Sequence, residues 1–150
     1  MLPRIFVDAD ACPVKDEVYR VAARTGVSVV LVANAYMRVP REESVELVVV
    51  PADPDAADDY IAERAGAGSI VITADIPLAD RCLKAGAIVL APNGKPFTEA
   101  SIGSQMATRS LMQDLRSGGD IVGGPPPFTK QNRSSFLQAL DAAIVRLARS

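Results

Sequence analysis

Aspartates follow the apolar runs of this sequence at three places: Asp8 and Asp10, Asp53 and Asp55, and Asp75. If these runs are parallel strands, their carboxyl ends meet at one edge of a sheet, where ligands bind in the crevice. Carboxylates gathered within several ångströms repel one another unless one stays protonated or a cation lies between them. The pattern therefore indicates an acidic crevice, and a hard divalent cation is the simplest remedy for its repulsion.

The absence of one residue type narrows the chemistry further. The chain contains no histidine, which excludes Ser-His-Asp and Cys-His catalysis, histidine zinc sites and imidazole as a general base. Metal ligands are then carboxylate oxygens, which favour Mg²⁺ or Mn²⁺. Such an ion can activate a water and hold a phosphoryl oxygen, the arrangement used to hydrolyse phosphodiesters.

Most of these acids also have a purely structural interpretation. Asp53 is explained as an N-cap and Asp55 as a first-turn acid of the helix that follows them. Asp75 could cap the helix expected from residue 77. Asp8 is the hardest to explain in this way, because it extends an apolar strand whose end needs no cap.

Other acids and a cysteine lie on the expected helices or beside the first acids. Asp58 and Asp59 fall in what we expect to be the second helical turn, where they form either a solvated face or a flank of the crevice. Asp16 and Asp80 stand near arginine or lysine and are interpreted as surface charge. Cys12 adjoins acids that raise a thiol pKa, so we interpret it as a packing residue and not as a nucleophile.

Length and composition favour one globular domain. The chain has 150 residues, is 49% hydrophobic and 23% charged, and carries a net charge of -2. Its two cysteines form no CxxC pair, so no zinc site or disulfide framework is indicated. We expect a cytoplasmic protein without a membrane association, since no basic leader and no run of ~18 apolar residues is present. The oligomeric state stays open.

Short apolar runs alternate with helical patterns along the chain, which is typical of a parallel sheet with crossover helices. The strands are expected at residues 4–8, 27–33, 45–50, 69–74 and 87–91. The helices are expected at residues 14–24, 53–65, 77–85, 98–115 and 134–148. We therefore predict a single three-layer α/β domain over residues 1–150. Its mostly parallel five-stranded sheet occupies a core of about 1–95, and a helical extension covers 96–150.

Four stretches carry a family resemblance: IFVDADACPVK, PDAADDYIA, VITADIPLA and GGPPPF, in this order. Together they resemble the YaiI/YqxD family of bacterial proteins essentially from end to end. That family is regarded as similar to the PIN-like nucleases, which are metal-dependent enzymes with acids on the edge of a parallel sheet. The resemblance implies a PIN-like fold and a metal-dependent nuclease.

The wider resemblance also assigns residues. DDYIA resembles the PIN pattern of an aspartate two residues before Ile-Ala, which places Asp58 in an acidic position. VITAD resembles the Thr-x-Asp that supplies Asp75, and Asp8 matches the aspartate that ends the first strand. A PIN-like domain usually has one more acid between these, often glutamate. No clear counterpart is present; Asp10 is the candidate substitute, and the number of metals stays open.

We therefore expect a Mg²⁺- or Mn²⁺-dependent nuclease acting on RNA or single-stranded nucleic acid. The residues expected to hold the metal and carry catalysis are Asp8, Asp10, Asp58 and Asp75. Asp59 is expected to support a metal ligand through a hydrogen bond. Lys15, Lys130 and Arg133 are expected to contact phosphates, the last two if the loop GGPPPFTKQN folds over the crevice. A solvated, proline-stiffened connection is the alternative for that loop.

Two other functions stay open. A strand that ends in DxD and the later TADIPLAD resemble motifs of the haloacid dehalogenase phosphatases, in which Asp8 would be the nucleophile and Asp10 the acid/base. Position 12 is a cysteine where that motif usually has threonine or valine. A non-enzymatic module that binds RNA or a protein is the other alternative, and the slightly acidic net charge fits it.

Overall fold

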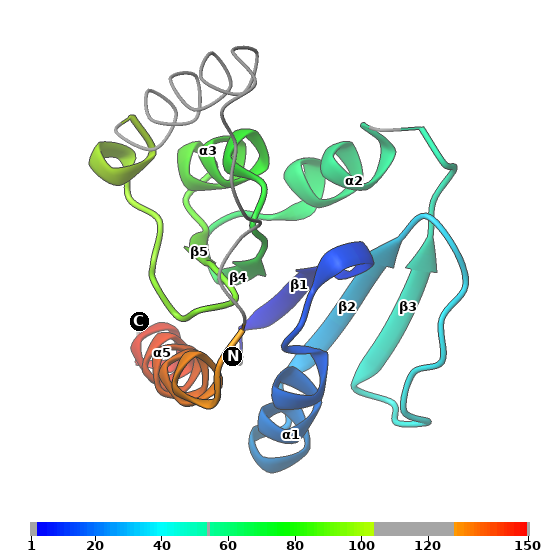
Figure 1. Ribbon diagram of the computed structural model, residues 1–150, viewed down its shortest axis with the longest axis horizontal. Coiled ribbons are helices and arrows are strands. Elements are labelled where there is room, and N and C mark those ends of the chain that lie inside the picture. Colours follow the sequence, from blue (N-terminus) through cyan, green and yellow to red (C-terminus); the bar gives the residue numbers. More distant parts are fainter. Residues whose placement is uncertain (1–2, 54, 104–127, 150) are drawn as a thin grey trace, which may run out of the picture.

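The computed structural model describes residues 3–53, 55–103 and 128–149 (Figure 1). Its sheet has five strands: β1 (Arg4–Asp8), β2 (Ser28–Ala33), β3 (Val45–Val49), β4 (Ser69–Ile72) and β5 (Ile88–Leu90). Every neighbouring pair is parallel, and the order across the sheet is β3-β2-β1-β4-β5. The predicted α/β class is confirmed.

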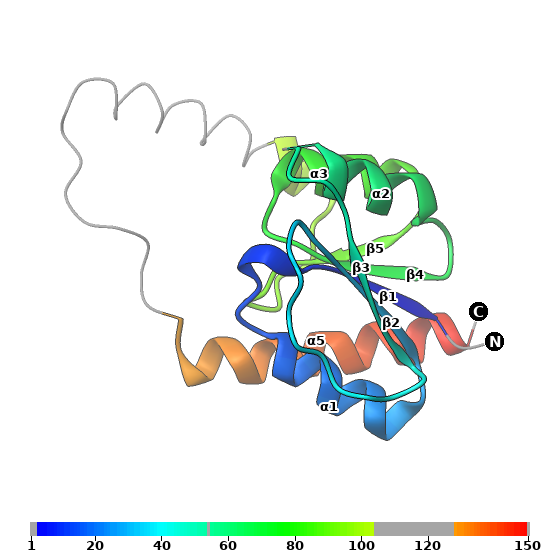
Figure 2. The same cartoon turned by 90° about the vertical axis from the view of Figure 1, so that its right-hand side faces the viewer.

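Helices cover both faces of the sheet. They are the short 3-10 helix η1 (Ala9–Ala11) and the α-helices α1 (Lys15–Thr25), α2 (Ala56–Arg64), α3 (Ile76–Lys84) and α5 (Lys130–Ala148). Figure 2 shows α1 and α5 on one side of the sheet and α2 and α3 on the other, so that the fold has three layers. Residues 99–103 are also helical. The remainder of the helix predicted at 98–115 and most of the GGPPPF loop lie outside the described residues.

The strand sequences lack alternation because both faces of the sheet are covered. In β4, Ile70, Val71 and Ile72 are all fully buried. Ile70 and Ile72 pack in the cluster beneath α1 and α5, whereas Val71 packs in the cluster beneath α2 and α3. Apolar residues at consecutive positions therefore serve two separate cores.

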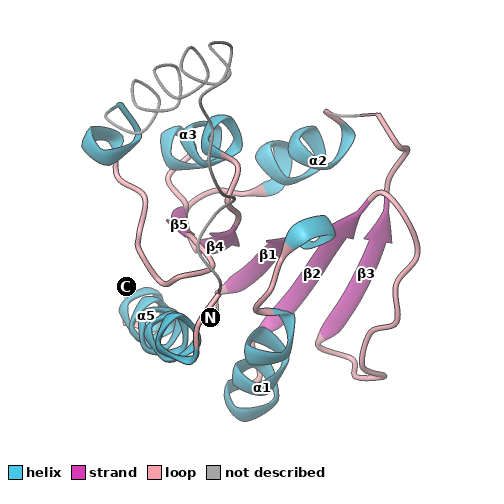
Figure 3. Ribbon diagram, in the orientation of Figure 1, coloured by secondary structure: helices cyan, strands magenta, loops and turns pink. Residues whose placement is uncertain are grey.

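The strand order defines where a ligand site can form. From β1 the chain proceeds to β2 and β3 in one direction and then returns to place β4 on the other side of β1. The strand order thus reverses between β1 and β4, which is where open parallel sheets bind ligands. Figure 3 shows β1, β2 and β3 ending at the same edge of the sheet.

The helix after β3 begins later than predicted. It starts at Ala56, and Asp55 occupies the N-cap position without a side-chain cap. Asp53 does not cap the helix; its Oδ1 accepts a hydrogen bond from the backbone N–H of Asp55 at 2.8 Å. The prediction of Asp53 as an N-cap was therefore wrong, because a local turn takes its carboxylate.

The last helix begins earlier than predicted, at Lys130 and not near Ser134. Thr129 and Asn132 form a reciprocal capping box: each side chain accepts a hydrogen bond from the backbone N–H of the other residue, at 3.1 and 3.0 Å. These bonds satisfy two of the free N–H groups of the first turn. None of the described helices is long and apolar enough to cross a membrane.

Candidate functional site

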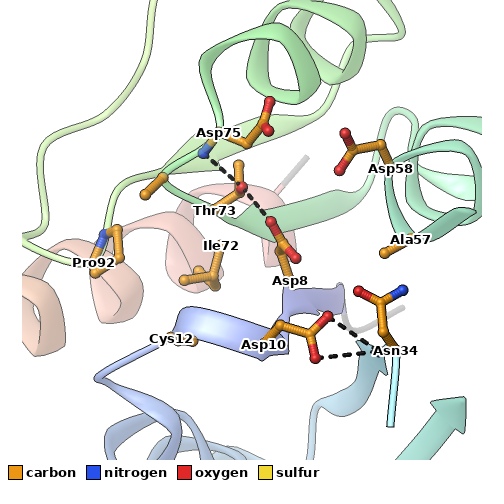
Figure 4. A pocket seen from close by; sticks show the side chains of 11 residues that line it. Asp8, Asp10, Cys12, Asn34, Ala57, Asp58, Ile72, Thr73, Asp75 and Pro92 are labelled. Carbon is orange, nitrogen blue, oxygen red and sulfur yellow. Dashed lines mark hydrogen bonds between the residues drawn. The ribbon is translucent and has the colours of Figure 1, made fainter. Parts of the chain in front are cut away.

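A cavity of about 320 Å³ lies at the carboxyl edge of the sheet (Figure 4). Its polar lining consists of four aspartates and two neutral residues: Asp8, Asp10, Asp58, Asp75, Asn34 and Thr73. The structure thus brings together the four acids that were predicted to form the site. They come from β1, η1, α2 and the N-terminus of α3.

Thr73 connects two of these acids. Its hydroxyl donates a hydrogen bond to Asp8 Oδ2 at 3.0 Å and accepts one from the backbone N–H of Asp75, also at 3.0 Å. The register of β1 against β4 pairs Val7 with Ile72, and the residues that follow this pair in the chain are Asp8, the last residue of β1, and Thr73, just after β4. Thr73 is 2% exposed, and its hydroxyl therefore orients Asp8 from within the protein.

Asp75 has the structural role that the sequence suggested as well as a place in the cavity. Its Oδ1 accepts a hydrogen bond from the backbone N–H of Leu78 at 2.9 Å, which caps α3. The cap uses one carboxylate oxygen. The second oxygen has no hydrogen-bond partner among the described residues and stays available to a ligand in the cavity.

Asn34 holds Asp10 in place. Its backbone N–H donates to both carboxylate oxygens of Asp10 at 3.1 Å. Its side-chain Nδ2 donates to the carbonyl oxygen of Pro51 at 2.9 Å. This bond turns Oδ1 of Asn34 to the cavity side, where Asp8 and Asp10 lie, as Figure 4 shows. The amide thus adds a neutral oxygen to the carboxylate donors.

Asp58 lies in the first turn of α2, not in the second as predicted, because the helix begins late. Burial, followed by the charges of Asp75, Asp8 and Asp55, raises the pKa of Asp58 to about 6, and Arg81 opposes the shift. Repulsion from the neighbouring acids thus contributes to the raised pKa of Asp58.

The pKa of Asp8 is also raised. Burial is the largest cause, and the charges of Asp75 and Asp10 add to it, while the hydrogen bond from Thr73 lowers it. Raised carboxyl pKa values in a cavity are common at functional sites, although structural networks produce them too. Here both shifted groups face the same cavity.

The cavity does not contain a ready-made chelate. In the part of the chain that the structure describes, no three His, Cys, Asp or Glu side chains are grouped so that they could hold a metal ion. Mg²⁺ commonly binds one or two protein carboxylates and keeps several waters. The carboxylate oxygens suit an ion held in this way, and Asp8 and the free oxygen of Asp75 are the candidate ligands. Cys12 also lines the cavity, but burial raises the pKa of its thiol and so disfavours a thiolate ligand.

The other predicted site residues do not line the cavity. Asp59 forms an ion pair with Arg81 at 2.9 Å. Lys15 Nζ donates to the carbonyl oxygen of Ala9 at 3.3 Å, and Lys130 is exposed at the start of α5.

Arg133 is partly exposed and contacts α1 and the residue Pro13 that precedes it. It donates to the carbonyl oxygen of Pro13 and to Glu17 Oε1, both at 2.9 Å. Glu17 is buried on α1, so this pair ties α5 to α1. A phosphate contact from Arg133 would have to compete with a partly buried ion pair.

Sequence reasoning missed two polar residues of the cavity. Thr73 lies two residues before Asp75, which was identified, and its hydroxyl directly after the apolar residues 70–72 was the available signal. Asn34 follows the run 27–33 in the same way, but a neutral amide does not belong to the charge pattern that indicated the acids. The two cavity residues that were not predicted are therefore both neutral polar residues that directly follow a strand.

Fold and site together define an all-parallel α/β protein with an acidic cavity at the reversal point of its sheet. Comparison with known sequences identifies the family of this chain. The model of the family described as "Uncharacterized BCR, YaiI/YqxD family" matches residues 6–146. The chain belongs to this family, and the predicted resemblance is confirmed at that level.

Relatives of known sequence cover nearly all of the chain. A UPF0178 protein of Sphingopyxis alaskensis is 66% identical over 148 residues, which is 98% of this chain and 96% of the relative. UPF0178 proteins of Nitrobacter winogradskyi and of Rhodopseudomonas palustris strain BisB18 are 62% and 61% identical over 147 residues. Those matches cover 98% of this chain and 94% and 95% of the relatives. No solved structure matches the chain.

Proposed function

We propose that this protein is a Mg²⁺- or Mn²⁺-dependent nuclease that hydrolyses phosphodiesters of RNA or single-stranded nucleic acid. The observation that carries the proposal is the convergence of Asp8, Asp10, Asp58 and Asp75 on one cavity at the sheet reversal. Burial is the largest cause of the raised pKa values of two of these carboxyl groups, Asp8 and Asp58, and the negative charges of their neighbours add to it. A divalent cation would relieve that repulsion and return both groups to their ionised form.

Each residue has a role that follows from its place. Asp8, oriented by Thr73, and Asp75 with its free oxygen would hold the ion between β1 and β4. Asp10, fixed by Asn34, and Asp58 would orient waters on either side or bind a second ion. When bound, the ion would supply Lewis-acid polarisation of the phosphoryl oxygen and a more acidic water. Without histidine, a carboxylate such as Asp58 is the available acceptor for the proton that leaves the water.

The phosphatase alternative is less well supported by the geometry. It requires Asp10 to donate a proton to a leaving group. Both oxygens of Asp10 instead accept from the N–H of Asn34, an arrangement that favours a fixed acceptor. Beryllium fluoride distinguishes the two enzymes, since it should bind covalently only to an aspartyl nucleophile at Asp8.

The direct test uses the full chain with labelled single-stranded RNA and DNA, with Mn²⁺ or with EDTA. Asp8→Asn should abolish cleavage. Asp80→Asn is the matched control, because Asp80 pairs with Lys84 on the surface of α3 and does not line the cavity. Cleavage that needs both Mn²⁺ and Asp8 supports the proposal. Mn²⁺ binding by calorimetry without cleavage of any substrate would contradict it and favour a binding module.

A further inference from the structure

The segment between β2 and β3 carries an unusually exposed aromatic side chain, two residues after the cavity-lining Asn34. Tyr36 is 81% exposed, against 50% and 47% for Val49 and Val145, the other large hydrophobic residues exposed in the described chain. The segment begins at Asn34, which lines the cavity and binds Asp10 through its backbone N–H. Tyr36 follows two residues later, so its backbone is anchored at the rim of the acidic site.

Packing of its neighbours holds the segment with Tyr36 outward. Met37 and Val39 are partly buried against the core cluster beneath α1 and α5, whereas Tyr36 and Arg38 are exposed. Neither the Tyr36 nor the Arg38 side chain makes a hydrogen bond or ion pair with a residue that the structure describes. The exposure of this aromatic ring is therefore set by the chain on both sides of it and not by a contact of its own.

An acidic cavity in a chain of net charge -2 repels a polyanion. A nucleic acid strand needs an adjoining surface that attracts phosphates or stacks bases before its backbone reaches the cavity. Arg38, two residues after Tyr36, supplies exposed positive charge, and Arg41 is exposed further along the segment. The exposed acids Glu42 and Glu43 follow Arg41, so the part of the segment nearer Asn34 is the part without negative charge. We call residues 36–41 the Tyr36 segment.

We propose that the Tyr36 segment is the binding surface for unpaired nucleotides, with one base stacked on the Tyr36 ring and a phosphate bound by Arg38. The inference rests on the proposed nuclease function and adds a preference for single-stranded over double-stranded substrates. Aromatic side chains stack on any base whose face is free, and a duplex hides those faces. The substrate class is therefore single-stranded, with little preference for base sequence.

Binding is measured by fluorescence anisotropy in the Asp8→Asn background, which keeps a polar side chain and prevents cleavage. The probes are a labelled single strand and the same strand in a duplex. Tyr36→Ala should weaken single-strand binding at least about fivefold, in keeping with the loss of one stacked base. Tyr36→Phe should bind normally, as should the control Val145→Ala on α5.

Arg38→Ala tests the phosphate contact separately. It should lower the slope of log K against log salt by about 0.7, the expected loss of one phosphate contact on a single strand. Equal affinities of Tyr36→Ala and the parent for the single strand, or equal affinity of the parent for strand and duplex, would overturn the inference.

Failure of the inference and failure of the proposed function give different results. If Mn²⁺- and Asp8-dependent cleavage occurs but Tyr36→Ala binds normally, the nuclease proposal stands and the Tyr36 inference falls. If no cleavage occurs but Tyr36→Ala weakens binding, the surface stands and the chain is a binding module.

Discussion

Replacing Asp58 by asparagine should make the protein more stable at neutral and alkaline pH in the absence of divalent cations. The pKa of Asp58 in the folded protein is about 6, against an ordinary value of 3.8. The folded state therefore binds more protons than the unfolded state between these values. Stability decreases as the pH rises through that window, and the loss is complete above about pH 7.

The shift also sets the size of the effect. A change of about two pKa units corresponds to roughly 3 kcal/mol at most. Asp58 is only half-buried and its repulsion is screened by solvent, so we expect about 1 kcal/mol. Asp58→Asn should thus gain ~1 kcal/mol over the parent at pH 8 and nothing at pH 4, where the parent carboxyl is largely protonated in the folded state.

Urea unfolding at pH 4 and pH 8 in EDTA measures both quantities. Asp80→Asn is the control, because it removes an acid that is paired with Lys84 and should produce no gain at pH 8. Added Mn²⁺ should stabilise the parent more than Asp58→Asn, since the ion replaces the proton as the partner of this carboxylate. A gain that is equal at both pH values, or absent at pH 8, would refute the electrostatic account of the cavity.

Two further predictions concern stability alone. Thr73→Val leaves Asp8 and the backbone N–H of Asp75 without their hydrogen-bond partner and should cost about 1–3 kcal/mol in urea unfolding at pH 8, whereas Thr73→Ser should retain most of the stability. Equal losses in both variants would exclude the hydroxyl as the cause. Gly94→Ala should lower thermal stability more than Gly68→Ala, although φ is 90° and 88° at the two sites. A Cβ at residue 94 would lie 2.6 Å from backbone atoms of α5, whereas at residue 68 it would meet nothing within 4 Å. This overlap should make Gly94→Ala roughly 1–3 kcal/mol more destabilising than Gly68→Ala. Equal losses of stability in the two variants would contradict this.

The features that could be predicted from the sequence are those set by residues close together in the chain. Apolar runs without alternation identified the five strands, since two-sided burial leaves no polar face. The cap at Asp75 followed from its place before a helix. Helix starts were less certain, because competing local hydrogen bonds decide them: the Asp53 turn delayed α2, and the pair Thr129 and Asn132 advanced α5.

The sequence by itself determined that Asp8 ends one strand and Asp75 closely follows another at the same edge of a parallel sheet, and that the metal ligands available there are mainly carboxylate oxygens. Only the tertiary structure decided which strand ends are neighbours. The order β3-β2-β1-β4-β5 places Asp75 beside Asp8 across Thr73, whereas Asp53 follows the edge strand β3 and does not line the cavity. The same packing directs Arg133 to Glu17 and turns the amide of Asn34 toward the acids. Strand order depends on contacts between residues distant in the chain, and these are not encoded in any local pattern.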